Sequence, residues 1–228
     1  MLKLENVSTT IAGIPVLRGI SCELTRGATV AVVGRNGAGK TTLLRLVMGF
    51  REGHEGRVLL DGQDLAQVPA RLRAKLGIGY APEDRVMFPS FSVEDNLRFP
   101  CEVIGMPRKA VDERLEETLT IVPELKVMLP RSGAALSGGQ GKMAALGRAV
   151  MAGERLVLLD EPFQGLAPVL AQQYSASLHR LHQARPELCV VITESNRSLL
   201  KDIPTSTLVL ERGELQAGEA AAAAAAVH

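Results

Sequence analysis

A glycine-rich loop near residue 34 constrains the fold more than any other feature of this chain. Residues 34–41 read Gly-Arg-Asn-Gly-Ala-Gly-Lys-Thr, which matches the pattern G-x-x-x-x-G-K-[ST]. The loop follows a continuous apolar run at residues 28–33 and precedes an apolar helical stretch at residues 43–48. This order predicts a buried strand, a phosphate-binding turn, and a helix whose positive N-terminal end faces an anion.

The residue types in this loop suit the chemistry of a nucleotide phosphate. The glycines let backbone N–H groups face a β-phosphate, Lys40 would neutralise β- and γ-phosphate oxygens, and the Thr41 hydroxyl would bind Mg²⁺. A glycine-rich turn with a chance lysine is the alternative interpretation, and the flanking strand and helix disfavour it. The predicted nucleotide-binding residues of this segment are Gly34, Arg35, Asn36, Gly37, Ala38, Gly39, Lys40, Thr41 and Thr42.

A second apolar run, at residues 156–159, ends in the acids Asp160 and Glu161. An aspartate at a strand end can orient the ligand shell of a metal ion, and a glutamate beside it can polarise an attacking water. Alternation along a strand would place the two carboxylates on opposite sides of the backbone. Exposed strand-end acids are the alternative, and the glycine-rich loop in the same chain disfavours it.

The third motif is the run Leu-Ser-Gly-Gly-Gln at residues 136–140, which precedes Asp160 by 20 residues. Ser137 and Gln140 have the spacing of a capping box and predict the start of a helix. The exposed amides beside Gly138 and Gly139, together with the Ser137 hydroxyl, could also bind an anion held by another subunit. The two interpretations are compatible.

The remaining pattern predicts an α/β fold. Continuous apolar runs at residues 28–33, 156–159 and 190–192 suit a parallel sheet that is covered on both faces, and the alternating residues 19–24 suit an antiparallel piece. Ser92 to Asp95 form a capping box, which opens a stretch without strand signals. We therefore expect one domain over residues 1–228: a P-loop NTPase core with a parallel sheet, an antiparallel β subdomain, and an inserted helical subdomain at about residues 91–150. No function is assigned to the Ala-rich tail at residues 217–228.

Composition excludes several classes of protein. The 26 Lys and Arg balance 25 Asp and Glu, and there is no Trp, so a nucleic acid is not an expected partner. No run of about 18 apolar residues or secretory pattern is present, which predicts a cytosolic chain that does not span a membrane alone. Cys22, Cys101 and Cys189 lie too far apart for a metal pair, and we expect them to be small buried apolar residues.

The three motifs together resemble the ATP-binding subunits of ABC transporters, in their order and spacing, over about residues 2–215. The resemblance implies ATP as substrate, Mg²⁺ as cofactor, and a dimer that clamps ATP between the P-loop of one subunit and Ser137, Gly138, Gly139 and Gln140 of the other. It implies an integral-membrane permease as partner, at the inner face of the cell membrane. The implied catalytic residues are Glu161, Lys40, Ser195 and Glu83, and the implied metal-directed residues are Thr41, Glu83 and Asp160.

Residues 80–83, 86–97 and 161–168 resemble most the ATPase subunits of branched-chain amino acid importers. This resemblance implies import of branched-chain or related amino acids or amides, a solute-binding protein in the complete system, and a second ATPase subunit, identical or different. Two positions depart from many relatives. Ile11 takes the place of an adenine-stacking aromatic residue, and Ser195 takes the place of a histidine, so it can hydrogen-bond a phosphate but carries no charge.

Two other functions remain open from the sequence. The chain could energise an exporter or an envelope-lipid system, or it could sense nucleotide and hydrolyse it weakly. The apolar residues Val86, Met87, Phe88 and Phe91 also have two interpretations. They could form the surface that grips the permease, or they could belong to the core.

Overall fold

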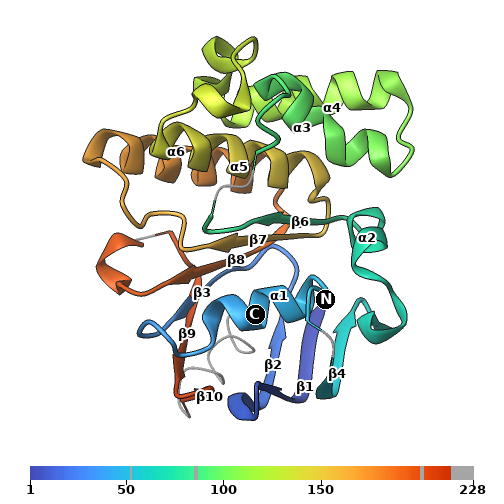
Figure 1. The fold of residues 1–228 in the computed structure, drawn as a ribbon, viewed down its shortest axis with the longest axis vertical. Helices are drawn as coiled ribbons and strands as arrows, with labels where there is room; N and C mark the ends of the chain where they lie inside the picture. The colour runs from blue at the N-terminus through green and yellow to red at the C-terminus, as the bar shows by residue number, and fades with distance from the viewer. Residues whose placement is uncertain (52, 85–86, 201–202, 217–228) are drawn as a thin grey trace. The chain divides into compact units, whose positions relative to one another are not determined.

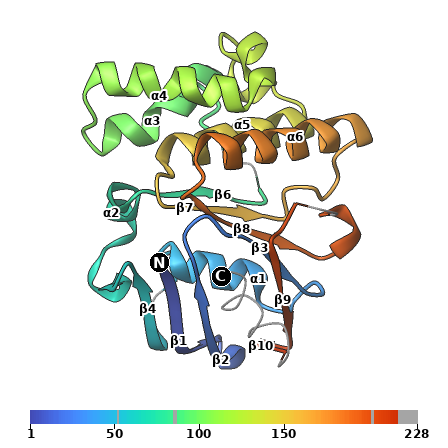
Figure 2. The same ribbon diagram turned by 180° about the vertical axis from the view of Figure 1, so that it is seen from behind.

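The computed structural model describes residues 1–51, 53–84, 87–200 and 203–216, and it divides the chain into two compact units (Figures 1 and 2). The first unit comprises Met1–Arg73 and the chain from Cys189 onward, and the second comprises Ala74–Leu188. Val86 and the Ala-rich tail at residues 217–228 lie outside the described residues. Each unit is described by itself.

The first unit contains an antiparallel sheet in the order β2-β1-β4-β5. Its strands are β1 (Leu2–Ile11), β2 (Ile14–Leu24), β4 (His54–Leu60) and β5 (Gln63–Asp64). In β1 the apolar Leu2 and Leu4 are buried and Lys3 between them is exposed, which is the alternation of a sheet with one wet face. The predicted antiparallel piece is therefore confirmed.

The first unit also contains parallel strands that carry the glycine-rich loop. Strand β3 (Thr29–Val33) pairs in parallel with β8 (Cys189–Glu194) and with β9 (Ser206–Glu211), and β10 (Glu214–Leu215) pairs antiparallel with β9. All six residues of β8 are buried, which suits the apolar run Cys189–Ile192 in its first four positions. The helices of this unit are α1 (Lys40–Val47) and α2 (Ala70–Arg73), with 3₁₀ turns at Leu65–Gln67 and Arg197–Leu199.

The second unit places helix α5 (Gly138–Ala152) against two parallel strands, β6 (Ile78–Ala81) and β7 (Leu156–Asp160). The contact is close, because a Cβ atom added at Gly79 would lie 1.9 Å from the carbonyl oxygen of Ala149. Only glycine lets strand and helix approach this far. The C-terminal part of α5 is thereby packed directly against β6.

Three more helices pack in the second unit: α3 (Val93–Val103), α4 (Arg108–Ile121) and α6 (Pro168–Ala184). Figure 1 shows α3 and α4 as a helical pair beside α5. Single turns of 3₁₀ helix lie at Ala74–Leu76 and Gly133–Ala135, and a longer one lies at Pro123–Met128. The predicted subdomain at about residues 91–150 falls within this unit, which also holds β6, β7 and α6.

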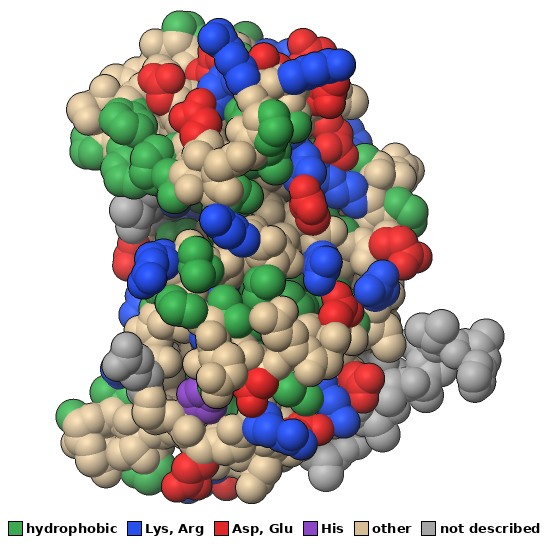
Figure 3. Space-filling model, turned by 90° about the vertical axis from the view of Figure 1, so that its right-hand side faces the viewer, with side chains coloured by type: hydrophobic (Ala, Val, Ile, Leu, Met, Phe, Trp, Pro, Cys, Tyr) green, Lys and Arg blue, Asp and Glu red, His purple; other side chains and the backbone are tan. Residues whose placement is uncertain are grey.

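The predicted capping box at Ser92 is confirmed, since the Asp95 amide donates to the Ser92 hydroxyl oxygen. The helical stretch that follows is broken between α3 and α4, where Gly105 has a φ of 81° and Pro107 precedes α4. None of the described helices is both long enough and apolar enough to span a membrane. Acidic and basic side chains are interspersed on the face in Figure 3, with no field of one sign.

The three cysteines are free thiols, with Cys101 and Cys189 buried and Cys22 half-buried. Burial raises the pKa of both Cys22 and Cys189 to about 12. A thiol with so high a pKa stays neutral at physiological pH and reacts slowly with electrophiles. The prediction of small buried apolar residues is confirmed for Cys101 and Cys189, whereas Cys22 is only half-buried.

A buried arginine anchors the C-terminal end of α1. The Arg73 guanidinium is 5% exposed and donates to the carbonyl oxygens of Leu46 (2.9 Å) and Val47, the last turn of the helix. It also donates to the carbonyls of Val68 (3.1 Å) and Leu65 (2.7 Å). One cation thus satisfies four backbone acceptors and favours the negative end of the helix dipole.

Replacing Arg73 by methionine is expected to lower the free energy of unfolding by about 2–4 kcal/mol, because buried carbonyls lose their donors. Urea unfolding of the full chain, followed by circular dichroism, measures the change. Arg71→Met is the matched control, since Arg71 lies on the same short helix and is exposed. Equal unfolding midpoints for the two variants would contradict the anchoring role of Arg73.

Candidate functional site

The start of α1 is built to receive an anion. Strand β3 ends at Val33, and the loop then turns at Gly37 (φ 82°) and at the N-cap Gly39 (φ 109°). No side chain caps this helix, and its first turn carries no acidic residue. A Cβ atom at Gly39 would lie 2.8 Å from Leu17 and 3.0 Å from the Val16 carbonyl, so another residue would displace the turn. The backbone N–H groups of α1 therefore retain the positive end of the helix dipole for a ligand.

Lys40 curls back over this loop. Its ammonium group donates to the carbonyl oxygens of Gly34 (2.6 Å) and Arg35 (3.2 Å) and to the hydroxyl oxygen of Ser195 (3.1 Å). The Ser195 hydroxyl in turn donates to the Asn36 side-chain oxygen, 2.6 Å away. The structure thus joins Lys40 and Asn36 to Ser195, which directly follows β8. These contacts hold the lysine over the loop where a phosphate would lie.

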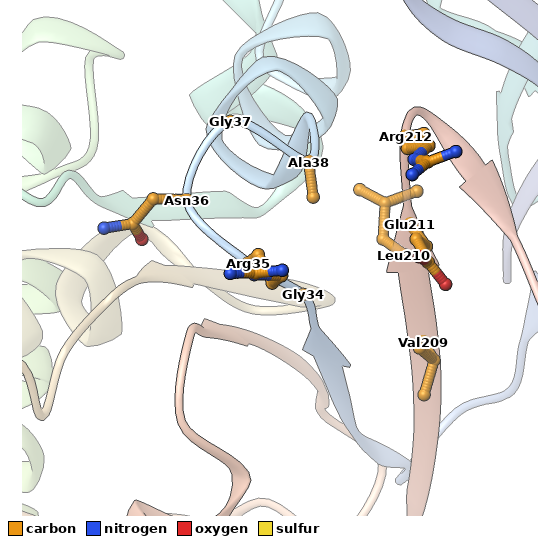
Figure 4. A pocket seen from close by; sticks show the side chains of 9 residues that line it. All are labelled: Gly34, Arg35, Asn36, Gly37, Ala38, Val209, Leu210, Glu211 and Arg212. Atoms are coloured by element: carbon orange, nitrogen blue, oxygen red, sulfur yellow. The ribbon is translucent and has the colours of Figure 1, made fainter.

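A cavity of about 520 Å³ opens beside the loop (Figure 4). The strand side contributes the apolar Val209 and Leu210, and the cations Arg35 and Arg212 come from the two sides. In Figure 4 the Asn36 side chain points away from β9. The lining comprises Gly34, Arg35, Asn36, Gly37, Ala38, Val209, Leu210, Glu211 and Arg212. The loop is therefore accessible from solvent on the side of β9.

Three further residues predicted to bind nucleotide, Thr41, Thr42 and Ile11, are half-buried in this unit. Thr41 and Thr42 are half-buried in the first turn of α1, directly after Lys40. Ile11 is half-buried at the end of β1 and pairs across the turn with Ile14, which is 67% exposed. An aliphatic surface therefore lies at this turn, where an aromatic side chain would offer a stacking platform.

In the second unit, Asp160 and Glu161 follow one another at the end of β7 and are both buried, with exposed fractions of 2% and 4%. The interpretation of these acids as exposed strand-end residues is therefore wrong. The Tyr80 hydroxyl donates to Oδ2 of Asp160 over 3.3 Å, across the β6–β7 pair. This contact orients the Asp160 carboxylate toward β6.

The alternation argument does not hold for Glu161. Strand β7 ends at Asp160, and Glu161 adopts a φ of 47°, in the left-handed region that non-glycine residues rarely occupy. A turn follows, in which the Gln164 amide donates to the Glu161 carbonyl over 3.3 Å. The direction of the Glu161 side chain is therefore set by this turn and not by the pleat of a strand.

The predicted capping box at the start of α5 is confirmed. The Gln140 amide donates to the Ser137 hydroxyl oxygen over 3.4 Å, and the Ser137 amide donates to the Gln140 side-chain oxygen over 3.1 Å. Arg131 also donates to that side-chain oxygen. Ser137 and Gly138 are exposed, so this end of the helix faces outward. A Cβ atom at Gly139 would meet the Leu170 side chain at 2.3 Å, which explains the small residue there.

Glu83 is exposed in the loop after β6. It lines a cavity of about 440 Å³ in the second unit together with Asp84, Gly138, Lys142, Gln164, Gly165 and Leu166. The cavity thus joins the loop after β6, the start of α5 and the turn after β7. Within the described residues, no group of three or more His, Cys, Asp and Glu lies together as a metal site.

An aromatic cluster lies after this loop. Two of its residues, Phe88 and Phe91, are among those that the sequence left open between surface and core, and the third, Phe99, lies in α3. The rings of Phe88, Phe91 and Phe99 contact one another, with centroids 4.7–5.8 Å apart. Phe88 is nevertheless 40% exposed. The buried Asn96 holds the loop, since it accepts from the Phe88 amide (2.8 Å) and donates to the carbonyls of Phe88 (3.1 Å) and Ser92 (2.9 Å). The cluster is therefore partly packed and partly surface.

Sequence reasoning missed two of these residues. Lys142 donates from its ammonium group to the Glu161 carbonyl oxygen, and Asn96 holds the aromatic loop. A signal existed for each. Lys142 is one of only two charged residues in α5, and Asn96 occupies the apolar face of α3 beside Val93 and Leu97. A polar residue at a buried helical position usually has a specific hydrogen-bond partner.

The predicted site residues fall into two groups. The first unit holds Ile11, the glycine-rich loop and Ser195, and the second holds Glu83, the motif at residues 137–140, Asp160 and Glu161. Within the first group the structure connects Lys40, Asn36 and Ser195. Within the second it connects Asp160 to Tyr80 and Glu161 to Lys142. Hydrogen bonds thus connect predicted site residues within each of the two units.

Comparisons with known proteins agree with these motifs. A model of the family described as ABC transporter matches residues 17–164. The high-affinity branched-chain amino acid transport ATP-binding protein BraG of Pseudomonas aeruginosa is 32% identical, over 94% of this chain and 91% of BraG. The probable branched-chain amino acid transport ATP-binding protein LivF of Archaeoglobus fulgidus is 28% identical, over 94% and 90%. The Fe(3+) ions import ATP-binding protein FbpC of Pseudomonas fluorescens is 35% identical, over 95% of this chain and 61% of FbpC.

Solved structures show the same fold. A structure described as the ATP binding subunit of an ABC transporter is 26% identical, with a TM-score of 0.82, and covers 95% of this chain and 88% of its own. A second, described as the ADP conformation of an ATP-binding cassette of an ABC transporter, is 25% identical, with a TM-score of 0.78 over 95% of this chain and 89% of its own.

Ser195→Ala is expected to raise the dissociation constant for a nucleoside triphosphate about threefold to tenfold, because Lys40 and Asn36 lose a shared hydrogen-bond partner. Binding of a fluorescent nucleotide to the full chain measures the change. Ser198→Ala is the control, since Ser198 is exposed and its hydroxyl donates to Asn196. Identical affinities in both variants would show that the Ser195 contacts do not organise the loop.

Proposed function

The chain belongs to the ABC transporter family as an ATP-hydrolysing subunit, and from that premise we propose that it powers an importer of branched-chain or related amino acids or amides. The observation that carries the proposal is the similarity to BraG and LivF over 94% of this chain. Residues 80–83, 86–97 and 161–168 support it, because they carry the sequence likeness to that subfamily. The similarity to an Fe(3+) importer makes another solute the main alternative outcome.

In the proposed mechanism, ATP binds with its phosphates against the N-terminal amides of α1, and Lys40 neutralises phosphate oxygens. The Glu161 carboxylate accepts a proton from a water whose oxygen attacks the γ-phosphorus. The bond between that phosphorus and the β–γ bridging oxygen breaks, and ADP and phosphate leave. Amides, Lys40 and the Ser195 hydroxyl are fixed in advance, so they stabilise the developing charge without rearranging.

The proposed metal-directed residues suit Mg²⁺. Thr41 offers a hydroxyl oxygen, and Asp160 and Glu83 offer carboxylates, the hard oxygen donors that this ion prefers. The Tyr80 contact keeps the Asp160 carboxylate in one orientation. When bound, Mg²⁺ would neutralise phosphate charge.

The start of α5 is proposed to act on the nucleotide of another subunit. Ser137 and Gly138 are exposed, and the first amides of α5 carry the positive end of its dipole. In a head-to-tail dimer this end would face the γ-phosphate bound by the second subunit. The second ATPase subunit would be a copy of this chain or a related one.

A membrane permease is the proposed main partner, and the aromatic cluster Phe88, Phe91 and Phe99 is the proposed docking surface. Phe88 exposes 40% of its surface, although two other rings contact it. The chain would then act at the cytoplasmic face of the membrane, and a solute-binding protein outside would complete the system.

Glu161→Gln is expected to lower ATP hydrolysis by about 100- to 10,000-fold, because the amide cannot accept the proton of the attacking water. ATP binding should remain within about threefold of the unchanged chain, because the P-loop contacts are intact. Phosphate release and nucleotide binding are measured on the same preparation. Glu154→Gln is the control, since Glu154 is exposed. Hydrolysis that survives in Glu161→Gln would reject the assigned base, and a chain that binds ATP but never hydrolyses it would favour a sensing role.

The importer proposal is tested by affinity purification of the tagged chain from detergent-solubilised membranes of its host, with mass spectrometry. A co-purifying permease is expected, and Phe88→Ser is expected to reduce its recovery severalfold, because an exposed ring leaves the interface. Val127→Ser is the control, since Val127 is 82% exposed. Loss of labelled leucine uptake on deletion of the gene would support a branched-chain amino acid as the transported solute. Loss of sulfate or iron uptake alone would overturn the proposed amino acid solute. Recovery of an exporter with the tagged chain would overturn the proposed importer role.

A further inference from the structure

Lys142 links the two motifs of the second unit. It lies in the second turn of α5, five residues after the N-cap Ser137, and its ammonium group donates to the main-chain carbonyl oxygen of Glu161. The same carbonyl accepts the Gln164 amide over 3.3 Å. The main-chain carbonyl oxygen of Glu161 therefore accepts two hydrogen bonds, one from a side chain and one from a backbone amide.

This carbonyl needs holding because the Glu161 backbone is strained. A φ of 47° costs a non-glycine residue about 1–2 kcal/mol, and the peptide unit after it could relax by rotating. Pro162 follows and donates no hydrogen bond that would hold the turn. A small rotation at this point would swing the buried Glu161 carboxylate, since side-chain direction follows from the backbone. Charge-assisted hydrogen bonds are stronger than neutral ones, so an ammonium donor suits this task.

The position of Lys142 is unusual for a lysine. Helix α5 is otherwise built mainly of buried small and apolar residues, and its other charged residue is Arg148. Lys142 is half-buried and lines the cavity that Glu83 and Asp84 also line. A cation at this place suits the carboxylates of the loop as well as the Glu161 carbonyl. The hydrogen bond to the Glu161 carbonyl is the contact that bears on the direction of the Glu161 side chain.

We propose that Lys142 is a positioning residue for ATP hydrolysis: it holds the turn that aims the Glu161 carboxylate and ties this turn to the start of α5. The proposal rests on the proposed role of Glu161 as general base. It has a further consequence for a dimer. The helix whose exposed end would face the partner subunit's nucleotide is the helix that fixes the base of this chain's own site, so closure at one site would steady the other.

A double-mutant cycle tests this role on the full chain, with phosphate release at saturating and limiting ATP. Lys142→Met is expected to lower kcat about tenfold to a hundredfold and to leave KM for ATP within about twofold, because the base is misplaced while binding contacts remain. Lys142→Arg should restore kcat to within about threefold, since a guanidinium keeps the charge and N–H donors. Lys109→Met is the matched control, because Lys109 is a helical lysine whose side chain is 90% exposed.

The decisive arm is the Glu161→Gln background. If Lys142 acts through Glu161, adding Lys142→Met should change the residual rate by less than about twofold, because the base is already lost. If the fold-losses in kcat of the two single variants multiply in the double variant, the positioning role is overturned. The same holds if the kcat of Lys142→Met equals that of the Lys109→Met control. If Glu161→Gln alone leaves kcat unchanged, the proposed base fails, and positioning by Lys142 fails with it for that distinguishable reason. Should Lys142→Met not fold, Lys142→Ala replaces it, because alanine favours the helix.

Discussion

The attraction between the positive N-terminal end of α1 and an anionic phosphate is the interaction on which the proposed nucleotide site depends. No side chain caps it, no acid neutralises its first turn, and Lys40 adds a cation at the same place. The start of α5 is satisfied differently, because Ser137 and Gln140 cap it reciprocally. The first end is the proposed site for the phosphates of this chain's own ATP. The second remains exposed and keeps its dipole, although its capping groups are already paired.

Both helices are anchored at their C-terminal ends by arginines. Arg73 donates to the last carbonyls of α1, and Arg185 donates to the carbonyls of Val150 (2.9 Å) and Gly153 (2.7 Å) at the end of α5. Arg185 also makes a bidentate pair with Glu117, and this hydrogen bonding lowers the Glu117 pKa below its ordinary value. A helix held at one end presents its other end in a fixed place. Such preorganisation strengthens a site that works by electrostatic stabilisation.

Local patterns predicted much of this structure and nothing of its long-range polar contacts. The loop at residue 34, the caps at Ser92 and Ser137 and the apolar strands were readable, because each depends on neighbours within a few positions. Contacts such as Lys142 to Glu161 span 19 residues and depend on how α5 packs against β7. Strand alternation failed at Glu161 because the strand ends one residue earlier. The left-handed backbone there has no sequence marker, since glycine is the usual sign of it.

In the proposed mechanism, the uncharged Ser195 makes the placement of Glu161 more important. At the end of β8 a hydroxyl replaces a group that could be a cation, so on this side the phosphate charge would meet Lys40 and main-chain amides. A hydroxyl can orient an oxygen, but it cannot offset the negative charge that builds up during hydrolysis. More of the rate then depends on proton removal, whose efficiency falls when the base is misaligned. A buried carboxylate suits this dependence when the turn that carries it is held, as the Glu161 turn is held by the hydrogen bond from Lys142 of α5 to its main-chain carbonyl.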